Sequence, residues 1–275
     1  MIIMNKIALK IAYDGEKFHG SQTQPNVHTV EDEIKKGLDK IKASYKNIKA
    51  ASRTDKGVSA IGNVISLKTG FNPEKIQRAL NSQTKNAWII GAKKVSKKFN
   101  PRKQAKTKHY RYYLPNPNGK YRIKRLKEAS KIFEGCHNFK NFSKSKKSNY
   151  NTNREIKKIK VKEKEPRDHR LIILDFYGKS FLWQMIRRLV TGIKKYSEDK
   201  LTHQNLIKRL KVKKNKGIEP SPPHNLILIK IKFEKLKFKH KKEPNRMIKE
   251  KLQKKLFKNL IRLQQAEDIV NELPK

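Results

Sequence analysis

The sequence is poor in the side chains that build disulfide or metal frameworks. Its single cysteine, Cys136, has no partner for an intramolecular disulfide and cannot form a structural zinc site by itself. His19, His28 and His224 lack a cysteine or a second histidine at ligand spacing. The sequence also lacks a glycine-rich phosphate loop and a nucleophile elbow. We therefore expect neither a metal nor a cofactor.

Long apolar runs are missing as well. No segment approaches the roughly 18 to 20 apolar residues that a membrane-spanning helix needs. Lys6 and Lys10 interrupt the N-terminus, where apolar residues alternate over residues 7–13 as in a strand and not as in an export signal. Together with the lone cysteine, this pattern predicts a cytoplasmic protein that does not insert into a membrane.

Acidic residues are scarce. The chain has 24 Asp and Glu against 69 Lys and Arg, which gives a formal net charge of +45 at pH 7. A positive field of this size attracts polyanions, so nucleic acid is the expected partner. A coding bias toward lysine would explain part of the excess without any binding role. The charge therefore supports RNA binding without establishing it.

One order of elements occurs twice, and its first copy spans residues 1–104. Thr29 can cap a helix that has acidic residues in its first turn, and Asn72-Pro73 opens a second helix with proline in the favoured first position. Strands are expected over residues 5–13, 46–51, 61–68 and 87–96. The order β-α-β-β-α-β is that of ferredoxin-like folds and RNA-recognition modules.

The second copy spans residues 105–234. Strands are expected over 106–114, 155–163, 169–177 and 225–233, helices over 124–134 and 180–196, and an extra helix from Thr202. The stretch Ser143–Asn153, rich in Ser, Lys and Asn, is typical of a loop. The fold class is thus α+β, with two tandem ferredoxin-like halves, antiparallel sheets and a central cleft where a ligand would bind.

A Lys-rich extension, residues 235–275, follows the second half. It predicts a helix from about Pro244, because apolar residues stand four apart there. These residues are Ile248, Leu252, Leu256 and Leu260. The helix could bind RNA or contact a second subunit, but we favour a helix that docks its apolar stripe on the body of the protein.

A charged loop between two expected strands carries Asp55. On composition alone, Arg53-Thr54-Asp55-Lys56-Gly57 would be a solvated turn. In an extended segment residues two apart point the same way, so Arg53 is expected beside Asp55, where a guanidinium favours the charged carboxylate. Lys56 adds a positive charge that can attract RNA. Because a carboxylate in an RNA-binding groove repels phosphate, its presence indicates a chemical role for Asp55.

The segment His109-Tyr110-Arg111-Tyr112-Tyr113-Leu114 is aromatic on both faces of its expected strand. Tyr110, Tyr112 and Leu114 share one face. An aromatic ring on a sheet can stack on an unpaired base, which contributes about 1 to 3 kcal/mol per base. For Tyr112, a core position with its hydroxyl at the rim is at least as good an interpretation.

A third set of residues lies in the expected helix over 180–196. Its apolar stripe is typical of a buried core face and comprises Leu182, Met185, Ile186, Leu189 and Val190. Arg187 and Arg188 project beside the stripe, where they could contact phosphate or a carboxylate.

Ordered motifs along the chain resemble those of the TruA family of pseudouridine synthases, in the variant of archaea and eukaryotes. They are Tyr13-Asp14-Gly15 with Phe18-His19-Gly20-Ser21-Gln22, the loop Ser52-Arg53-Thr54-Asp55-Lys56-Gly57-Val58-Ser59-Ala60, Phe99-Asn100-Pro101-Arg102, Tyr110-Arg111-Tyr112, Asn138-Phe139-Lys140-Asn141-Phe142, the helix segment Phe181–Arg187, and Leu226. Together they cover nearly all of residues 5–233. The common family loop has Gly, Ala and His where this chain has Ser52, Lys56 and Ser59, and Ser21 stands where the family has an aromatic residue.

The resemblance implies a pseudouridine synthase fold and a cofactor-free isomerase that turns uridine into pseudouridine in tRNA. The implied targets lie in the anticodon stem-loop, at tRNA positions 38 to 40. Family members commonly act as homodimers, so a homodimer is the expected assembly.

The resemblance also implies roles for particular residues. Asp55 would be the catalytic aspartate, with Arg53 as its partner and as a residue that helps to hold the target nucleotide out of the stem. Tyr110 corresponds to the tyrosine that stacks on the target uracil, and Leu226 to the apolar residue on the other side of the base. Arg187 would steady Asp55. Arg102 and Lys56 are further candidates for RNA contact.

Two alternatives remain open at this point. One is the same chemistry on other tRNA positions or other RNAs. The other is a non-catalytic RNA-binding protein built from two RNA-recognition-like units, which would have no use for the set Arg53, Asp55 and Tyr110. The route also stays open, because the carboxylate could attack the anomeric carbon, remove a sugar proton to form a glycal, or add to the base.

Overall fold

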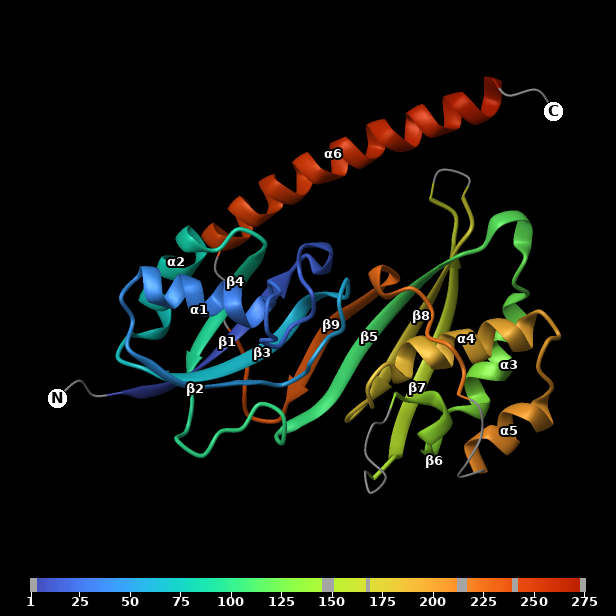
Figure 1. The fold of residues 1–275 in the computed structure, drawn as a ribbon, viewed down its shortest axis with the longest axis horizontal. Coiled ribbons are helices and arrows are strands. Elements are labelled where there is room, and N and C mark those ends of the chain that lie inside the picture. The colour runs from blue at the N-terminus through green and yellow to red at the C-terminus, as the bar shows by residue number, and fades with distance from the viewer. Residues whose placement is uncertain (1–3, 145–150, 167–168, 212–216, 239–241, 273–275) are drawn as a thin grey trace.

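A computed structural model describes residues 4–144, 151–166, 169–211, 217–238 and 242–272. Within these residues nine strands form one sheet in the order β4-β1-β3-β9-β5-β8-β7-β6, and β2 pairs with β3 off this path. Helices α1 and α2 lie over the first half of the sheet, and α3, α4 and α5 lie over the second half (Figure 1). The predicted α+β fold class is confirmed.

The first half has the predicted order β-α-β-β-α-β. It contains β1 (Asn5–Tyr13), α1 (Val30–Lys40), β2 (Tyr45–Ala50), β3 (Ser59–Thr69), α2 (Pro73–Gln83) and β4 (Ala87–Lys94). Both helices begin as expected, because Thr29 Oγ1 accepts a hydrogen bond from the backbone N–H of Asp32 (3.3 Å) and Asn72 Oδ1 accepts one from that of Lys75 (2.8 Å).

The second half repeats the pairing of the first. It contains β5 (Ala105–Pro115), α3 (Ile123–Ile132), β6 (Gly135–Asn138), β7 (Asn153–Lys164), β8 (Leu171–Gly178), α4 (Met185–Ser197), α5 (His203–Lys211) and β9 (Leu226–Phe233). Its strand order β9-β5-β8-β7 corresponds to β4-β1-β3-β2 in the first half. The predicted opening of α5 is confirmed by reciprocal bonds of 3.1 Å between Thr202 and Asn205.

Three details of the second half differ from the prediction. Strand β6 was not predicted, because its four residues are too few to show an alternating pattern. Helix α4 begins at Met185 and not at residue 180, because Gln184 has a left-handed backbone with φ of 59°. In the expected loop 143–153, residues 145–150 lie outside the described residues, and Asn153 already belongs to β7.

The two halves join where β3 meets β9. These strands pair in parallel over two positions, Ser59 with Ile227 and Ala60 with Leu228. The other end of β3 pairs with β2, whose last partnered residue is Ala50. Along β3, β2 is the neighbouring strand at one end and β9 is the neighbouring strand at the other end. Residues 51–58 leave the sheet between these two pairings. The boundaries predicted for the halves and the extension stay predictions.

The outer face of β5 and β8 carries a closed ionic cluster. Asp175, 3% exposed, accepts two bonds from Arg111 (2.8 and 3.0 Å) and contacts His109 Nε2 at 2.7 Å. Burial alone would raise the pKa of Asp175, but the bonds from Arg111 and His109 lower it below its usual range. This face of the aromatic strand therefore has a structural role.

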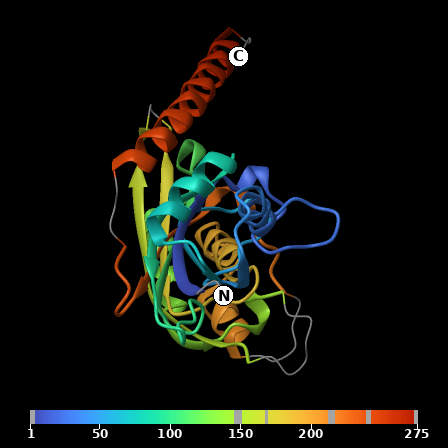
Figure 2. The same ribbon diagram turned by 90° about the vertical axis from the view of Figure 1, so that its left-hand side faces the viewer.

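Helix α6 (Lys242–Glu272) projects along one edge of the molecule (Figures 1 and 2). The prediction that its apolar stripe docks on the body is wrong, because Leu252 and Leu256 are 43% and 55% exposed. The side chain of Ile248 lies outside the described residues. Over the described residues the structure has no helix with the length and apolar character needed to span a bilayer.

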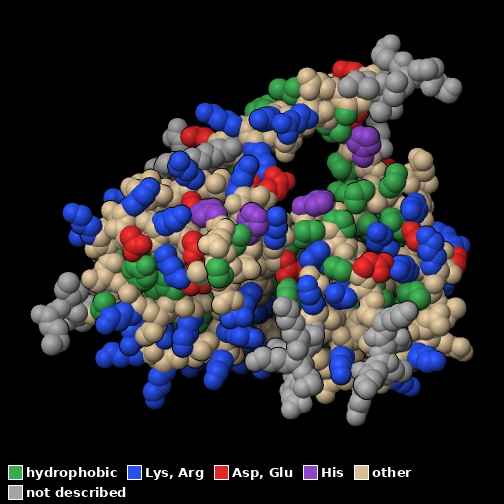
Figure 3. Space-filling view, in the orientation of Figure 1, with side chains coloured by type: hydrophobic (Ala, Val, Ile, Leu, Met, Phe, Trp, Pro, Cys, Tyr) green, Lys and Arg blue, Asp and Glu red, His purple; other side chains and the backbone are tan. Residues whose placement is uncertain are grey.

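Charged side chains connect α6 to both halves. Lys255 Nζ lies 2.5 Å from Asp14 Oδ2 and 3.0 Å from Glu16 Oε2, and Glu267 Oε1 lies 3.0 Å from His169 Nε2. Figure 3 shows an opening between α6 and the body below it. The helix thus arches over the body and is attached by ion pairs.

We predict that a chain ending at Phe238 keeps its thermal stability. Partly exposed ion pairs contribute about 0 to 1 kcal/mol each, so the loss of α6 removes little stabilisation. A chain ending at Glu234 also loses Leu236 and Phe238, which pack on the core, and should unfold at a clearly lower temperature. Calorimetry of the two truncated proteins checks this, and a large loss for the Phe238 truncation would contradict it.

The buried cluster should also make stability depend on pH. We predict that Asp175→Asn lowers the free energy of unfolding at pH 7 by about 3 kcal/mol, because it leaves Arg111 without its carboxylate. Since the folded-state pKa of Asp175 is lowered, its contribution is present above the unfolded-state pKa of about 3.9 and is lost as the pH falls below that value.

Urea unfolding of both proteins from pH 7 to pH 3 measures this difference, which should narrow toward acid pH. The exposed Glu234, paired with Lys106 at 3.0 Å, provides a control, because Glu234→Gln should leave the unfolding midpoint unchanged. A difference that stays constant with pH would rule out the ionic contribution.

Candidate active site

The loop over residues 51–58 is fixed by side chains of the first half. Thr54 bonds with its hydroxyl to Tyr13 Oη (2.9 Å) and with its backbone N–H to Ser21 Oγ (2.8 Å). Asn63 Nδ2 donates to the backbone oxygen of Ser52 (2.9 Å). Ser21, which departs from the common motif, thus helps to fix the loop.

Two glycines allow the loop its close packing. Gly57 has a φ of 83°, a backbone conformation that residues with a side chain rarely adopt. It lies against Pro223, which precedes β9. A Cβ on Gly15 would lie 2.3 Å from the backbone carbon of Val58, so only glycine fits there. The turn after β1 and the loop over residues 51–58 therefore pack backbone against backbone.

Asp55 receives two bonds from the other half of the molecule. Arg187 Nη1 lies 2.8 Å from Asp55 Oδ2, and Trp183 Nε1 donates to Asp55 Oδ1 at 3.0 Å. The side chains of Asp55 and Arg187 are 22% and 11% exposed. A charge-assisted pair at this distance fixes the orientation of the carboxylate.

Arg187 is itself held in place. Its Nε donates to the backbone oxygen of Ser221 (2.6 Å), and the N–H of Ser221 donates to the backbone oxygen of Arg187 (3.1 Å). The hydroxyls of Ser221 and Thr191 lie 2.7 Å apart. The bond from Nε to Ser221 restricts the orientation of the Arg187 guanidinium, so that Nη1 points at Asp55.

The expected pairing of Arg53 with Asp55 is not found. The side chain of Arg53 is exposed and has no carboxylate within ion-pair distance among the described residues, so Arg187 alone pairs with Asp55. The carboxylate instead faces the second half of the molecule, where Arg187 and Trp183 bond to its two oxygens. Lys56 and Arg102 are also exposed.

Tyr110 is 5% exposed and points its hydroxyl toward the loop. Its Oη lies 2.7 Å from Ser52 Oγ, and its ring meets Phe181 edge-on with centroids 5.5 Å apart. Burial raises the pKa of Tyr110, so the phenol stays neutral. Tyr112 is 1% exposed and belongs to the core, as the alternative interpretation had it.

Leu226 begins β9 and is 6% exposed. It pairs with Tyr112, while Tyr110 pairs with Leu228, so Leu226 and Tyr110 lie on adjacent strands. The next residue, Ile227, pairs with Ser59 at the end of the Asp55 loop. The structure therefore brings the loop, Tyr110 and Leu226 to the same joint, together with Arg187.

Two residues at this joint were missed from sequence. Trp183 lies in a segment that we assigned to a helix, and its 47% exposure beside a carboxylate depends on the left-handed turn at Gln184. Lys108 could have been found, because it stands two residues before Tyr110 and so shares its face of β5.

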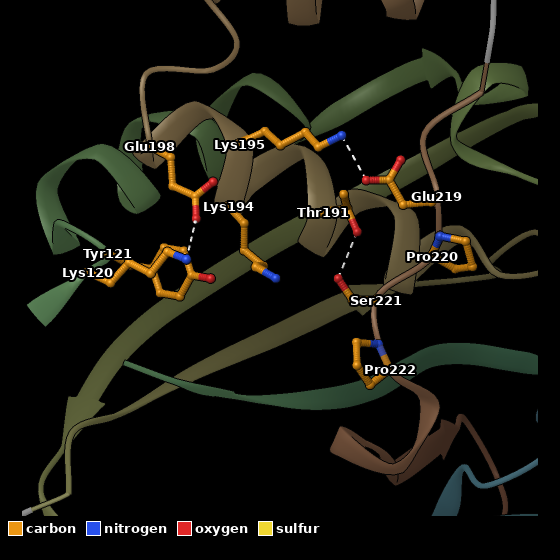
Figure 4. A pocket seen from close by; sticks show the side chains of 10 residues that line it. All are labelled: Lys120, Tyr121, Thr191, Lys194, Lys195, Glu198, Glu219, Pro220, Ser221 and Pro222. Atoms are coloured by element: carbon orange, nitrogen blue, oxygen red, sulfur yellow. Dashed lines mark hydrogen bonds and ion pairs between the residues drawn. The ribbon is translucent and has the colours of Figure 1, made fainter. Parts of the chain in front are cut away.

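A hollow of about 250 Å³ lies against α4, and Thr191 and Ser221 form part of its lining (Figure 4). Its acidic residues are engaged, Glu198 with Lys120 at 3.3 Å and Glu219 with Lys195 at 2.7 Å. Asp55 does not line it, so it is not the site described above. In the described part of the chain, no group of three or more His, Cys, Asp or Glu side chains is placed to hold a metal ion.

Comparisons with known proteins show the family to which the chain belongs. Residues 10–102 and 129–234 match the family model described as tRNA pseudouridine synthase. A protein named tRNA pseudouridine synthase A from Pyrococcus furiosus is 43% identical over 235 residues, which cover 85% of both chains. Its namesake from Pyrococcus horikoshii is 40% identical, covering 85% of this chain and 87% of its own.

Among solved structures, a chain of a Cbf5-Nop10-Gar1 complex aligns with 69% of this chain and 44% of its own length. The TM-score is 0.33 at 16% identity, which is too slight a likeness to carry an argument.

We predict that the emission of Trp183 reports the state of Asp55. The chain has two tryptophans, and Trp88→Phe leaves Trp183 as the single tryptophan, which can be excited selectively at about 295 nm or longer wavelength, beyond the absorption of tyrosine. In that background, Asp55→Ala removes the indole N–H acceptor, so the emission should shift to longer wavelength and quenching by acrylamide should increase. Asp39→Ala, an exposed carboxylate elsewhere, should change neither property. Unchanged spectra for Asp55→Ala would contradict the bond.

Proposed function

Because the chain belongs to the tRNA pseudouridine synthase family and is thus an isomerase, we propose that it converts uridine to pseudouridine in the anticodon stem-loop of tRNA, with Asp55 as the catalytic carboxylate. The observation that carries the proposal is the placement of Asp55. It comes from the first half of the chain and is oriented by Arg187 and Trp183 from the second half. A simple surface turn would not be assembled across the joint in this way.

The reaction suits a fixed carboxylate without an added cofactor. It breaks the bond between N1 of uracil and the anomeric carbon, rotates the base, and forms a bond from C5 to the same carbon. The atoms balance, no water is consumed, and the proton lost from C5 is matched by the one gained at N1. Asp55 can act by attack on the anomeric carbon, by removing a sugar proton, or by addition to the base.

The residues around Asp55 suggest where the target base and the RNA backbone would bind. A base must leave its stack to reach Asp55, which costs a few kcal/mol and is cheapest in a loop or at a stem end. Tyr110 and Leu226 would offset this cost by holding the uracil between them. Arg53, Lys56 and Arg102 are exposed and free to approach phosphates, with Arg53 helping to keep the nucleotide flipped.

The charge of the chain fits tRNA as the substrate. A net charge of +45 allows the enzyme to recognise tRNA by its shape and phosphates, which is the common mode for structured RNA. A homodimer that acts in the cytoplasm is part of the same proposal. The homodimer rests on the family resemblance, and the cytoplasmic location rests on the lone cysteine and the strand-like N-terminus.

The proposal predicts where modification occurs. Incubation of the protein with an unmodified tRNA transcript, followed by chemical modification and primer extension, should reveal pseudouridine at positions 38 to 40. Asp55→Ala should form no product while binding the same transcript with similar affinity, because it removes the reacting group and keeps the basic surface. Asp39→Ala is the matched control and should remain active.

The outcomes separate the parts of the proposal. An Asp55→Ala protein that still isomerises uridine would overturn the role of Asp55. Modification only outside the anticodon arm would overturn the choice of site and favour the same chemistry on other uridines. Binding without modification by the wild-type protein would favour the non-catalytic alternative.

A further inference from the structure

Lys108 is a buried lysine without a carboxylate partner among the described residues. It lies on β5, is 6% exposed, and its Nζ donates to the backbone oxygen of Ala51 (2.8 Å) and to Ser52 Oγ (3.1 Å). Burial, together with the charge of nearby Arg102, lowers the pKa of Lys108 to about 8. A buried ammonium held only by neutral oxygens costs stability. Its presence therefore needs an explanation beyond packing.

Ser52 connects this lysine to Tyr110. An ammonium group can only donate, so Ser52 Oγ accepts from Lys108 and shares a second bond of 2.7 Å with the hydroxyl of Tyr110. Ser52 is 8% exposed, so water does not replace these bonds readily. The common family loop has glycine at this position, and glycine could make neither side-chain bond.

The same network fixes the start of the Asp55 loop. Lys108 bonds the backbone of Ala51, and Asn63 bonds the backbone oxygen of Ser52 at 2.9 Å. Asp55 follows Ser52 by three residues. Strand β5, the loop and the tyrosine ring are thus linked through one buried hydroxyl, that of Ser52.

We propose that Lys108 and Ser52 are positioning residues, which lock the ring of Tyr110 and the first residues of the loop so that the stacking face and the Asp55 carboxylate keep one relative geometry. The inference rests on the proposed function, because it assigns these residues to the reaction at Asp55. A displacement of about 1 Å at a reacting group can reduce the rate by about a hundredfold. Holding Tyr110 and the loop together is therefore a direct benefit to turnover.

Single substitutions test the effect on turnover. Ser52→Ala and Lys108→Met should each lower kcat on a tRNA transcript about tenfold and leave KM within about twofold, because they disturb the reacting geometry and not the RNA-binding surface. Lys106→Met is the matched control. This residue lies on the same strand and pairs with the exposed Glu234, so its substitution should leave kcat unchanged.

A double-mutant cycle tests whether the effect passes through Tyr110. Tyr110→Phe already removes the hydroxyl, so adding Ser52→Ala to it should cause less than about a twofold further loss of kcat. Independent structural damage would instead make the two losses multiply. Thermal unfolding of each variant shows whether lost turnover follows lost stability, and the inference requires that it does not.

The results separate this inference from the proposed function. Loss of product with Asp55→Ala, together with full kcat for Ser52→Ala and Lys108→Met, would overturn the inference alone. Multiplying losses in the cycle would overturn it as well. If Lys108→Met does not fold, Ser52→Ala and the cycle with Tyr110→Phe decide the matter, because neither removes a buried charge.

Discussion

The parallel pairing of β3 with β9 is the contact on which the rest of the structure depends. It involves only two positions, Ser59 with Ile227 and Ala60 with Leu228, yet it places residues from both halves around one loop. Asp55 precedes β3, Leu226 opens β9, and Arg187 is bonded to Ser221 just ahead of β9. Neither half contains the whole site, so the carboxylate obtains its partners only when the two halves share a sheet.

The loop at this joint is surrounded by buried polar groups, although burying a polar group costs free energy of folding unless it is hydrogen-bonded. Burial raises the pKa of Tyr13 to about 12, and its hydroxyl bonds to Thr54. Lys108 retains a charge with no carboxylate among the described residues. Such groups stabilise a fold only when every bond is made, which restricts the loop to few arrangements. At the joint, buried polar side chains therefore fix the conformation of the loop, and they occupy positions where apolar side chains would otherwise be buried.

The sequence predicted the elements well, because their signals are local. Apolar periodicity and the caps at Thr29, Asn72 and Thr202 depend on neighbouring residues alone, and the structure confirms them. The partner of Asp55 was harder to predict from the sequence. Local spacing suggested Arg53, whereas the carboxylate bonds to Arg187 and Trp183 of the second half. That Arg187 would steady Asp55 came from family resemblance, since no local pattern connects residues 132 positions apart. The docking of α6 failed because periodicity shows a helix face without showing what covers it.

One short segment between β8 and α4 contacts both Tyr110 and Asp55. Phe181 covers an edge of the Tyr110 ring, and two residues later Trp183 occupies an oxygen of Asp55. The left-handed backbone of Gln184 ends this segment and separates it from the rigid helix that carries Arg187. Tyr110 is only 5% exposed, so the stacking role proposed for its ring would require part of this segment to be displaced, and Trp183, which is bonded to an Asp55 oxygen, belongs to the same segment. Under that proposal, entry of the base would also free the Asp55 oxygen held by Trp183, whereas the bond from Arg187 to the other oxygen comes from helix α4 and lies outside the segment.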